Sequence, residues 1–308
     1  MLAAVRIGAS VRSGYRVDDA RMGAQWMIER ARAASDAGLD CLLVGDQHIT
    51  APVAYYQNTA ILGRLLSEWD SRPAGALFLL PLWNPVLVAE QAGTLAAIGG
   101  GPFILQVALG SGRERFAGMG AAFEDRSRRL ETGVDVVRRL LSGEVVDSVE
   151  PIPIRGASVA PLPPAGFEVW VGARAAPAIE RAARIGDCWY GDPGLTLGAA
   201  AEALARYREY CHQYGRTPGR LPIRRDLHVA ADDADAERVL GPLLTAGYRG
   251  IDTSALAVGT VARVVDLLGA YADLGFTDVI ARQIASDQTD ALASYERLAE
   301  VRSQLVSM

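Results

Sequence analysis

The sequence predicts an α/β protein built as a closed (β/α)8 TIM barrel, on the strength of three observations. Eight short apolar runs, each about the length of a strand, recur along the 308 residues. Segments with an apolar residue every three or four positions separate these runs, as in amphipathic helices. No linker, repeat or low-complexity segment interrupts the alternation, so a single domain over 1–308 is expected. An open doubly wound sheet is the alternative, because periodicity alone does not separate the two folds.

The apolar runs and stripes predict each element in order. The expected strands cover residues 5–10, 41–46, 75–81, 104–110, 169–173, 188–192, 223–230 and 277–282. Helical stripes are clearest over 130–141, 200–211, 261–271 and 292–301. Thr260 is the expected N-cap of the third of these helices, since its side chain can accept a bond from a backbone N–H.

Two long intervals between strands predict insertions after the fourth and seventh strands. The first, about 144–167, is rich in proline and contains two short β-like pieces, and could cover the barrel mouth or make a subunit contact. The second covers about 240–274, with Gly241-Pro242 and the stretch 247–250 as expected helix breakers. The acidic run 232–237 is expected in the first turn of a helix, where carboxylates suit the helix dipole, and no metal site is expected.

Composition excludes several classes of protein. All 31 basic residues are arginine, which excludes enzymes that need a lysine Schiff base or a Walker A lysine. A net charge of −5 without a basic block argues against nucleic-acid binding. The three cysteines are far apart and predict buried, reduced thiols. No signal peptide or membrane span is recognisable, so a soluble cytoplasmic protein is expected.

Chemistry-bearing residues follow several predicted strands, and the C-terminal strand ends of a parallel barrel hold its active site. Asp46 and His48 close the second strand and should point the same way, since side chains alternate with period two. Histidine exchanges protons near neutral pH. Small residues end the fourth strand, and the turn 172–175 opens a helix whose N–H groups could bind an anion. Of Arg224 and Arg225, one should face inward, to bind an acidic group or to pair with Asp226 or Asp278.

Three blocks of sequence resemble the luciferase-like flavin-dependent oxidoreductases, a family of TIM barrels. They are Pro81–Leu95, Phe116–Gly120 and Val169–Ala173. The resemblance implies an enzyme, most simply a monooxygenase that uses reduced FMN and O2 on a small organic substrate. The alternative is an F420-dependent oxidoreductase that transfers hydride without oxygen. A flavin-binding barrel without catalysis and an isomerase or lyase on the same fold stay open.

The same resemblance implies roles for individual residues and for partners. His48 and Asp46 would be catalytic, with Gln47 standing where some members carry a second histidine. The residues implied in flavin-ring contact are Ala76, Leu77, Phe78, Ala108, Gly110 and Ser111. A non-prolyl cis peptide is expected near Leu77. The turn Gly172, Ala173, Arg174 and Ala175 would bind the cofactor phosphate, and Trp83 and Tyr190 would line the substrate pocket. A homodimer and a separate flavin or F420 reductase are implied as partners.

Overall fold

The computed structural model describes residues 5–307, and its main sheet closes into a parallel barrel. The eight barrel strands are β1 (Arg6–Val11), β3 (Leu42–Val44), β5 (Ala74–Phe78), β6 (Phe103–Val107), β9 (Phe167–Ala173), β10 (Cys188–Gly191), β11 (Pro222–Val229) and β13 (Asp278–Gln283). The sheet order is β10-β9-β6-β5-β3-β1-β13-β11, and β10 also pairs with β11. Each predicted strand coincides with one of these, so the TIM barrel is confirmed and the open sheet is wrong.

The chain divides into two compact units. One, here the C-terminal unit, consists of Met1–Arg12, Ile28–Leu42 and Gly172–Met308. The other, the central unit, consists of Ser13–Met27 and Leu43–Val171. Helix α1 (Ala20–Asp36) contributes residues to both.

Strands β5, β6 and β9 follow one another in the sheet and lie mainly in the central unit. Gly75 of β5 pairs with Ile104 of β6, which in turn pairs with Glu168 of β9. The unit's helices are α2 (Asn58–Leu65), α3 (Pro85–Gly99), α4 (Arg113–Gly118) and α5 (Arg126–Leu141), with short 3-10 turns η1 (Leu66–Glu68) and η2 (Leu80–Leu82). Helix α3 begins at Pro85 because Asn84 is its N-cap. The Asn84 side chain accepts from the Val86 N–H at 2.9 Å, and Pro85 has no N–H that would need a partner.

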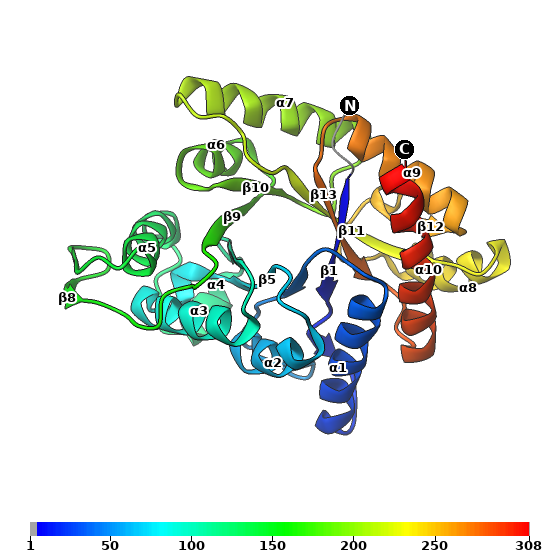
Figure 1. Ribbon diagram of the computed structural model, residues 1–308, viewed down its shortest axis with the longest axis horizontal. Coiled ribbons are helices and arrows are strands. Elements are labelled where there is room, and N and C mark those ends of the chain that lie inside the picture. Colours follow the sequence, from blue (N-terminus) through cyan, green and yellow to red (C-terminus); the bar gives the residue numbers. More distant parts are fainter. Residues whose placement is uncertain (1–4, 308) are drawn as a thin grey trace. The chain divides into compact units, whose positions relative to one another are not determined.

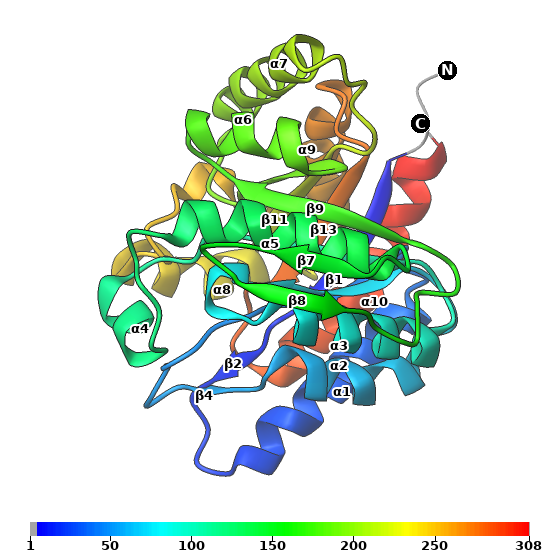
Figure 2. The same cartoon turned by 90° about the vertical axis from the view of Figure 1, so that its left-hand side faces the viewer.

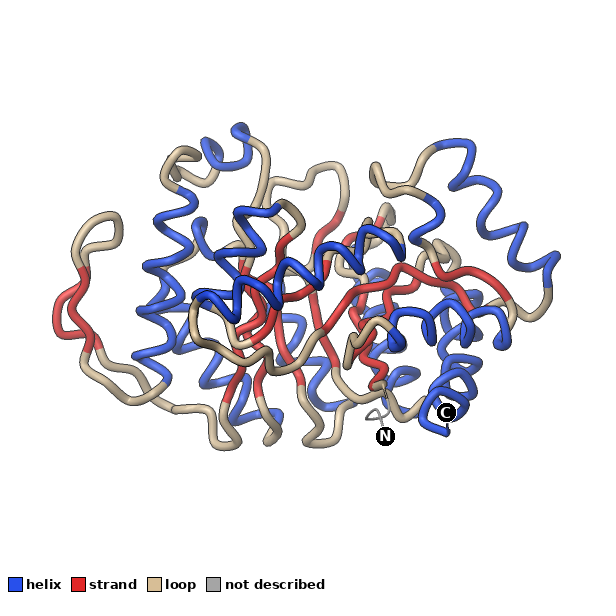
Figure 3. Tube along the Cα trace, turned by 90° about the horizontal axis from the view of Figure 1, so that it is seen from above, coloured by secondary structure: helices blue, strands red, loops and turns tan. Residues whose placement is uncertain are grey.

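Two small antiparallel pairs complete this unit. Strands β2 (Gly14–Tyr15) and β4 (Ala54–Tyr55) pair near its start. Strands β7 (Val146–Ser148) and β8 (Ile154–Ala157) form a hairpin in the first predicted insertion, as its two β-like pieces suggested (Figure 2). Figure 3 shows this hairpin as two short red strands that project beyond the unit's helices.

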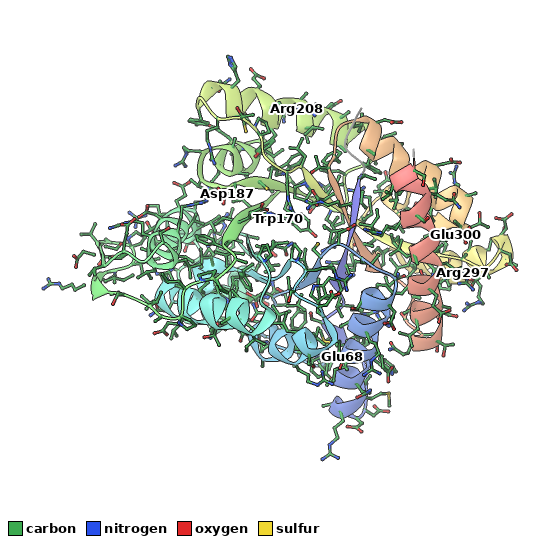
Figure 4. All side chains as sticks on the ribbon, viewed as in Figure 1. Glu68, Trp170, Asp187, Arg208, Arg297 and Glu300 are labelled. Atoms are coloured by element: carbon green, nitrogen blue, oxygen red, sulfur yellow. The ribbon has the colours of Figure 1, made fainter. Side chains whose placement is uncertain are left out.

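The C-terminal unit carries the remaining helices. They are α6 (Ala176–Ile185), α7 (Leu197–Gln213), α8 (Asp233–Ala246), α9 (Val261–Asp273) and α10 (Gln288–Ser307). Helices α9 and α10 lie side by side (Figure 1). Arg297, labelled on α10 in Figure 4, donates to the Val229 carbonyl at the end of β11 at 3.2 Å. This bond ties the last helix to a barrel strand.

The second insertion differs from its prediction at one point. Helix α8 runs through Gly241-Pro242, so this pair does not break the helix. A helix-interior proline removes one backbone bond, and α8 continues past it to end at Ala246, where the following Gly247, with a φ of 74°, is the C-cap. A 3-10 turn, η3 (Thr253–Ala255), and a short strand, β12 (Ala257–Gly259), follow, and β12 pairs with β11.

Two helix starts in this unit agree with the predictions made for them. Asp232 caps α8 by accepting from the Asp235 N–H at 2.8 Å, so the acidic run lies in a first turn as predicted. Thr260 caps α9 by accepting from the Arg263 N–H. Cys41, Cys188 and Cys211 are buried and form no disulfide among the described residues, also as predicted. In the part of the chain that the structure describes, no helix has both the length and the apolar character that a bilayer crossing requires.

Candidate functional site

Asp46 and His48 lie just past the end of β3 in the central unit and are both buried. Their residues are 5% and 8% exposed. His48 Nε2 is 3.3 Å from Asp46 Oδ1. The expected convergence of these side chains is therefore confirmed.

The other carboxylate oxygen fixes the orientation of Asp46. Asp46 Oδ2 accepts from the Leu79 backbone N–H at 2.8 Å and from the Trp83 indole N–H at 2.8 Å. An ionised carboxylate is an acceptor on both oxygens, so two bonds to Oδ2 leave Oδ1 directed at the imidazole. Residues 33 and 37 positions away in the sequence thus hold this acid in place.

The facing atoms of the pair are close but not aligned for a hydrogen bond. Within residues 5–307, neither Asp46 Oδ1 nor His48 Nε2 has a hydrogen-bond partner. Buried polar atoms are nearly always bonded, so each such exception needs an explanation. A group that binds at this point and exchanges a proton with the imidazole provides one.

Trp83 lies against the His48 imidazole, and Arg115 holds the His48 backbone. The His48 and Trp83 ring centroids are 5.6 Å apart, and Phe78 meets Trp83 edge-on at 5.3 Å. Trp83 was expected in the substrate pocket, and the structure places it beside His48. Arg115 Nε donates to the His48 carbonyl at 3.0 Å and its Nη1 donates to the Ser111 carbonyl at 2.8 Å. Arg115 was not predicted from the sequence. The available signal was its position in α4, four residues after Ser111, which lies on the loop before that helix.

The three predicted ring contacts on β5 do not share one face. Ala76 and Phe78 are fully buried, whereas Leu77, on the opposite face, is partly exposed. Asn58, at the start of α2, donates to the Leu77 carbonyl at 2.6 Å and is itself fully buried. Every cis peptide among the described residues precedes a proline, so the peptides around Leu77 are trans and the expected cis bond is absent there.

The end of β6 has the small residues that the approach of a planar ring requires. Ala108 and Gly110 are partly exposed and Ser111 is exposed. The Ala108 N–H donates to the Phe78 carbonyl at 3.1 Å, which fixes the strand ends together. Gly110 has a φ of 72°, a conformation that favours glycine, so its lack of a side chain is a backbone requirement.

A cavity of about 270 Å³ adjoins Trp83 on the central unit. It lies between the start of α3 and the start of α5. Asn84, Asp125 and Arg129 supply polar groups to its wall, and Met119 and Ile152 supply apolar ones. Arg129 is not free to turn into it, because Nε donates to the Pro81 carbonyl at 2.9 Å.

The predicted phosphate turn belongs to the C-terminal unit. Ala173 ends β9, and the Trp189 indole N–H donates to its carbonyl at 2.9 Å. Ala175 is the N-cap of α6 and offers no side-chain bond to the first N–H groups. Arg174 Nη1 is 3.9 Å from Asp192 Oδ1. Pro177, the second residue of α6, has no N–H, and the Ala178 N–H donates to the Ala175 carbonyl at 2.9 Å, so the first turn leaves the Ala176 N–H and the exposed Arg174 side chain as possible donors to an anion.

The other predicted residues of this unit are Tyr190, Arg224 and Arg225, and they differ in burial and in bonding. Tyr190 is half-buried on β10. Arg225 is fully buried and donates to the Leu195 carbonyl at 2.6 Å and the Tyr271 hydroxyl at 2.7 Å, so it holds the fold together. Arg224 pairs with Asp226 at 2.8 Å, the salt bridge that the sequence offered as an alternative. No group of His, Cys, Asp and Glu residues in 5–307 is arranged to hold a metal ion.

Comparison with known proteins gives a consistent family and fold. The family model for luciferase-like monooxygenases matches residues 5–252. An F420-dependent glucose-6-phosphate dehydrogenase of Kribbella flavida is 27% identical over 223 residues, 68% of this chain and 65% of that protein. The chain thus spans less than two thirds of the length of this curated relative.

Two solved structures illustrate the likeness of fold. An F420-dependent secondary alcohol dehydrogenase in complex with an F420–acetone adduct has a TM-score of 0.79 and 16% identity, covering 97% of this chain and 98% of that one. The oxygenating constituent of 3,6-diketocamphane monooxygenase from Pseudomonas putida, in complex with FMN, has a TM-score of 0.77 and 16% identity, covering 96% and 97%.

Proposed function

This chain belongs to the luciferase-like monooxygenase family, and on that premise we propose that it is an oxidoreductase dependent on a flavin or on the deazaflavin F420. The observation that carries the proposal is the buried Asp46–His48 pair, whose facing atoms lack hydrogen-bond partners at a strand end of a parallel barrel. Active sites of such barrels lie at strand ends. A binding barrel without chemistry has no need of this pair.

The cofactor is the finer question. F420 is the first candidate, because the dehydrogenase from Kribbella flavida, matched over 68% of this chain, is described as F420-dependent. The reaction would then be hydride transfer without oxygen. Reduced FMN with O2, acting on a small organic substrate, is the second candidate. The family's description and the FMN-bound structure of similar fold support it.

The residues of the central unit have distinct roles in this proposal. When bound, either cofactor supplies the electrons, and the protein supplies position, protons and exclusion of water. His48 would hold or release the proton at Nε2, the atom without a partner. Asp46 would orient the imidazole. Trp83 would keep water from the pair while its indole N–H holds Asp46.

Two further sets of residues would contact the cofactor. Leu77, Ala108 and Gly110 would face its ring, because they are the partly exposed members of the predicted set. Gly172–Ala175 would bind its phosphate through the Arg174 side chain and the Ala176 N–H at the start of α6. Trp83 and Tyr190 would line the substrate pocket, and a homodimer served by a separate reductase remains part of the proposal.

An anaerobic titration tests the proposal and separates the two candidates. FMN and F420 are each added in oxidised and reduced form, and binding is followed by absorbance and calorimetry. Submicromolar binding of F420 alone supports hydride transfer, and of reduced FMN alone supports the monooxygenase. If neither binds below about 1 mM, a free energy of only about −4 kcal/mol, the proposed function is wrong.

A further inference from the structure

Three arginines surround one buried carboxylate in the C-terminal unit. Asp226, on β11, has a fully buried side chain and accepts from Arg224 Nε at 2.8 Å. The Tyr248 hydroxyl donates to Asp226 Oδ2 at 2.9 Å, and Arg249 Nη1 donates to the same oxygen at 3.2 Å. Arg282 Nη1 is 3.5 Å away from it. We call these five residues the Asp226 cluster.

Positive charge exceeds negative charge at this point. Within 5–307, Asp226 is the one carboxylate within 4.0 Å of either Arg224 or Arg249, so these two guanidinium groups share a single negative charge. Burial alone would raise the pKa of Asp226, but the charges of Arg224, Arg282 and Arg249 outweigh burial and lower it. Burial, together with repulsion from Arg282 and Arg224, lowers the pKa of Arg249. Asp226 alone therefore does not neutralise the guanidinium groups around it.

The donors also exceed the acceptors. Each guanidinium carries five N–H groups. Arg224 directs two nitrogens at Asp226 and Arg249 directs one. Asp226 Oδ2 already has these two arginines and Tyr248 around it. The cluster therefore has bonds to give to a second oxygen-rich anion, and side-chain exposures of 18% for Arg224 and 48% for Arg249 leave it reachable.

The backbone that carries Arg249 is unusual in an independent way. Arg249 has a φ of 53°, which residues other than glycine seldom adopt, and it lies between two glycines of positive φ, Gly247 and Gly250. A β-bridge between Tyr248 and Ile251 closes this tight turn. Strained backbone of this kind is concentrated at ligand sites. The turn brings Tyr248 and Arg249 onto a carboxylate that β11 alone would leave uncovered.

We propose that the Asp226 cluster binds an anionic group, a carboxylate or a phosphate, of the organic substrate. The inference rests on the proposed function, because it names the class of substrate for the same enzyme. Arg224 and Arg249 make the charge-assisted bonds, Tyr248 adds a neutral donor, and Asp226 holds the donors in place in the absence of substrate. The substrate class is therefore an organic acid or a phosphate ester rather than a neutral molecule.

The test uses inorganic phosphate as the probe and measures its binding by calorimetric titration. The protein is first saturated with the cofactor that it binds, so that the turn 172–175 is already occupied. Arg249→Gln removes one charge of the cluster on a half-exposed side chain. Arg206→Gln, on the exposed face of α7 in the same unit, removes the same charge elsewhere. We expect Arg249→Gln to weaken phosphate binding at least about tenfold, the loss of one charged hydrogen bond, and Arg206→Gln to leave it unchanged. Cofactor affinity should be the same in all three proteins.

Two results would overturn the inference. One is equal phosphate affinity in Arg249→Gln and Arg206→Gln, which would make the cluster a structural ion-pair network. The other is loss of cofactor affinity in Arg249→Gln with unchanged phosphate affinity, which would assign the cluster to the cofactor. If the wild type binds neither cofactor, the proposed function fails, and the same comparison on the unliganded protein still decides whether the cluster binds an anion.

Discussion

The imidazole of His48 is the group in the central unit best placed to move a proton. The ring is buried beside Trp83, and its Nε2 has no hydrogen-bond partner among the described residues. Arg115 donates to the backbone carbonyl of His48. General acid–base residues contribute about 10²- to 10⁴-fold to rate. The effect of such a residue on the reaction rate can be measured separately from its effect on cofactor affinity.

His48→Ala should therefore lower kcat at least about 10²-fold while changing the dissociation constant of the cofactor by less than about threefold. Steady-state kinetics and the anaerobic titration measure the two effects. His212→Ala is the matched control, because His212 is exposed on α7. An unchanged kcat in His48→Ala would contradict the role given to this residue.

A second histidine makes stability depend on pH. His228, on β11, is 1% exposed, and its Nε2 lies 3.3 Å from Asp235 Oδ2. Burial lowers the pKa of His228, and the hydrogen bond and charge of Asp235 offset this only in part. The folded protein therefore takes up a proton here at lower pH than the unfolded chain, whose value is near 6.5.

The stabilising effect of neutral His228 is complete above pH 6.5 and is lost as the pH falls from 6.5 through the lower folded-state pKa. Urea unfolding at a series of pH values should show a steeper loss of stability below pH 6.5 in the wild type than in His228→Gln. His212→Gln, at an exposed position on α7, is the control for loss of a histidine. Identical slopes in all three proteins would show that His228 does not titrate differently in the folded state.

Sequence reasoning at this scale found the residues but not their partners. Strand alternation was enough to bring Asp46 and His48 together, because they are two positions apart. The bonds from Leu79 and Trp83 to Asp46 cross more than thirty positions and depend on how β5 and η2 follow β3. Likewise, Arg249 reaches Asp226 only because of a left-handed turn that the sequence marks with two glycines.

Strands β5 and β6 position the candidate ring contacts, and Gly75 is where they approach most closely. A Cβ at Gly75 would lie 1.9 Å from the backbone oxygen of Ile104, its register partner. The Ile104 backbone could move away from this Cβ only if the pairing of β5 with β6 shifted. Gly75→Ala should therefore cost about 2–4 kcal/mol in the free energy of unfolding, as measured by chemical denaturation.

Gly198→Ala is the control for this substitution. Gly198 lies in the first turn of α7 with open space where its Cβ would be. Alanine is favoured over glycine in a helix by up to about 1 kcal/mol, so this change should be neutral or stabilising. Similar destabilisation by both changes would mean that the close approach of β5 and β6 is not what constrains Gly75.

Elements with a strongly apolar pattern were predictable, whereas α1, although 17 residues long, was given no range from the sequence. All eight barrel strands and the helices α5, α7, α9 and α10 follow the predicted runs. The short pieces β2, β4, β12 and α4 were missed, because two to six residues are too few to show a period. Gly241-Pro242 was wrongly predicted to break a helix, since one missing N–H does not outweigh the rest of α8.

At the scale of the whole molecule, family and fold were predictable and the cofactor was not. Three blocks that resemble the family pattern identified the family, and the barrel followed from alternation. Among the solved structures of similar fold, one contains an F420 adduct and another contains FMN. The choice of cofactor therefore depends on local contacts rather than on the fold. Binding of either cofactor is nevertheless measurable as a change in the stability of the whole chain, because a ligand that binds only the folded state stabilises it.

Ala175→Asp uses this linkage to test the phosphate turn. Aspartate is a good N-cap and alanine a poor one, so the variant without cofactor should be as stable as the wild type or more stable. Its carboxylate would occupy and repel the anion site at the start of α6. Cofactor at 100 times its wild-type dissociation constant should stabilise the wild type by about 2.7 kcal/mol and should stabilise Ala175→Asp by less than about 1 kcal/mol. Thermal unfolding with and without cofactor measures both effects. Ala175→Ser, a neutral cap, should keep most of the wild-type gain; an equal gain in Ala175→Asp would place the phosphate elsewhere.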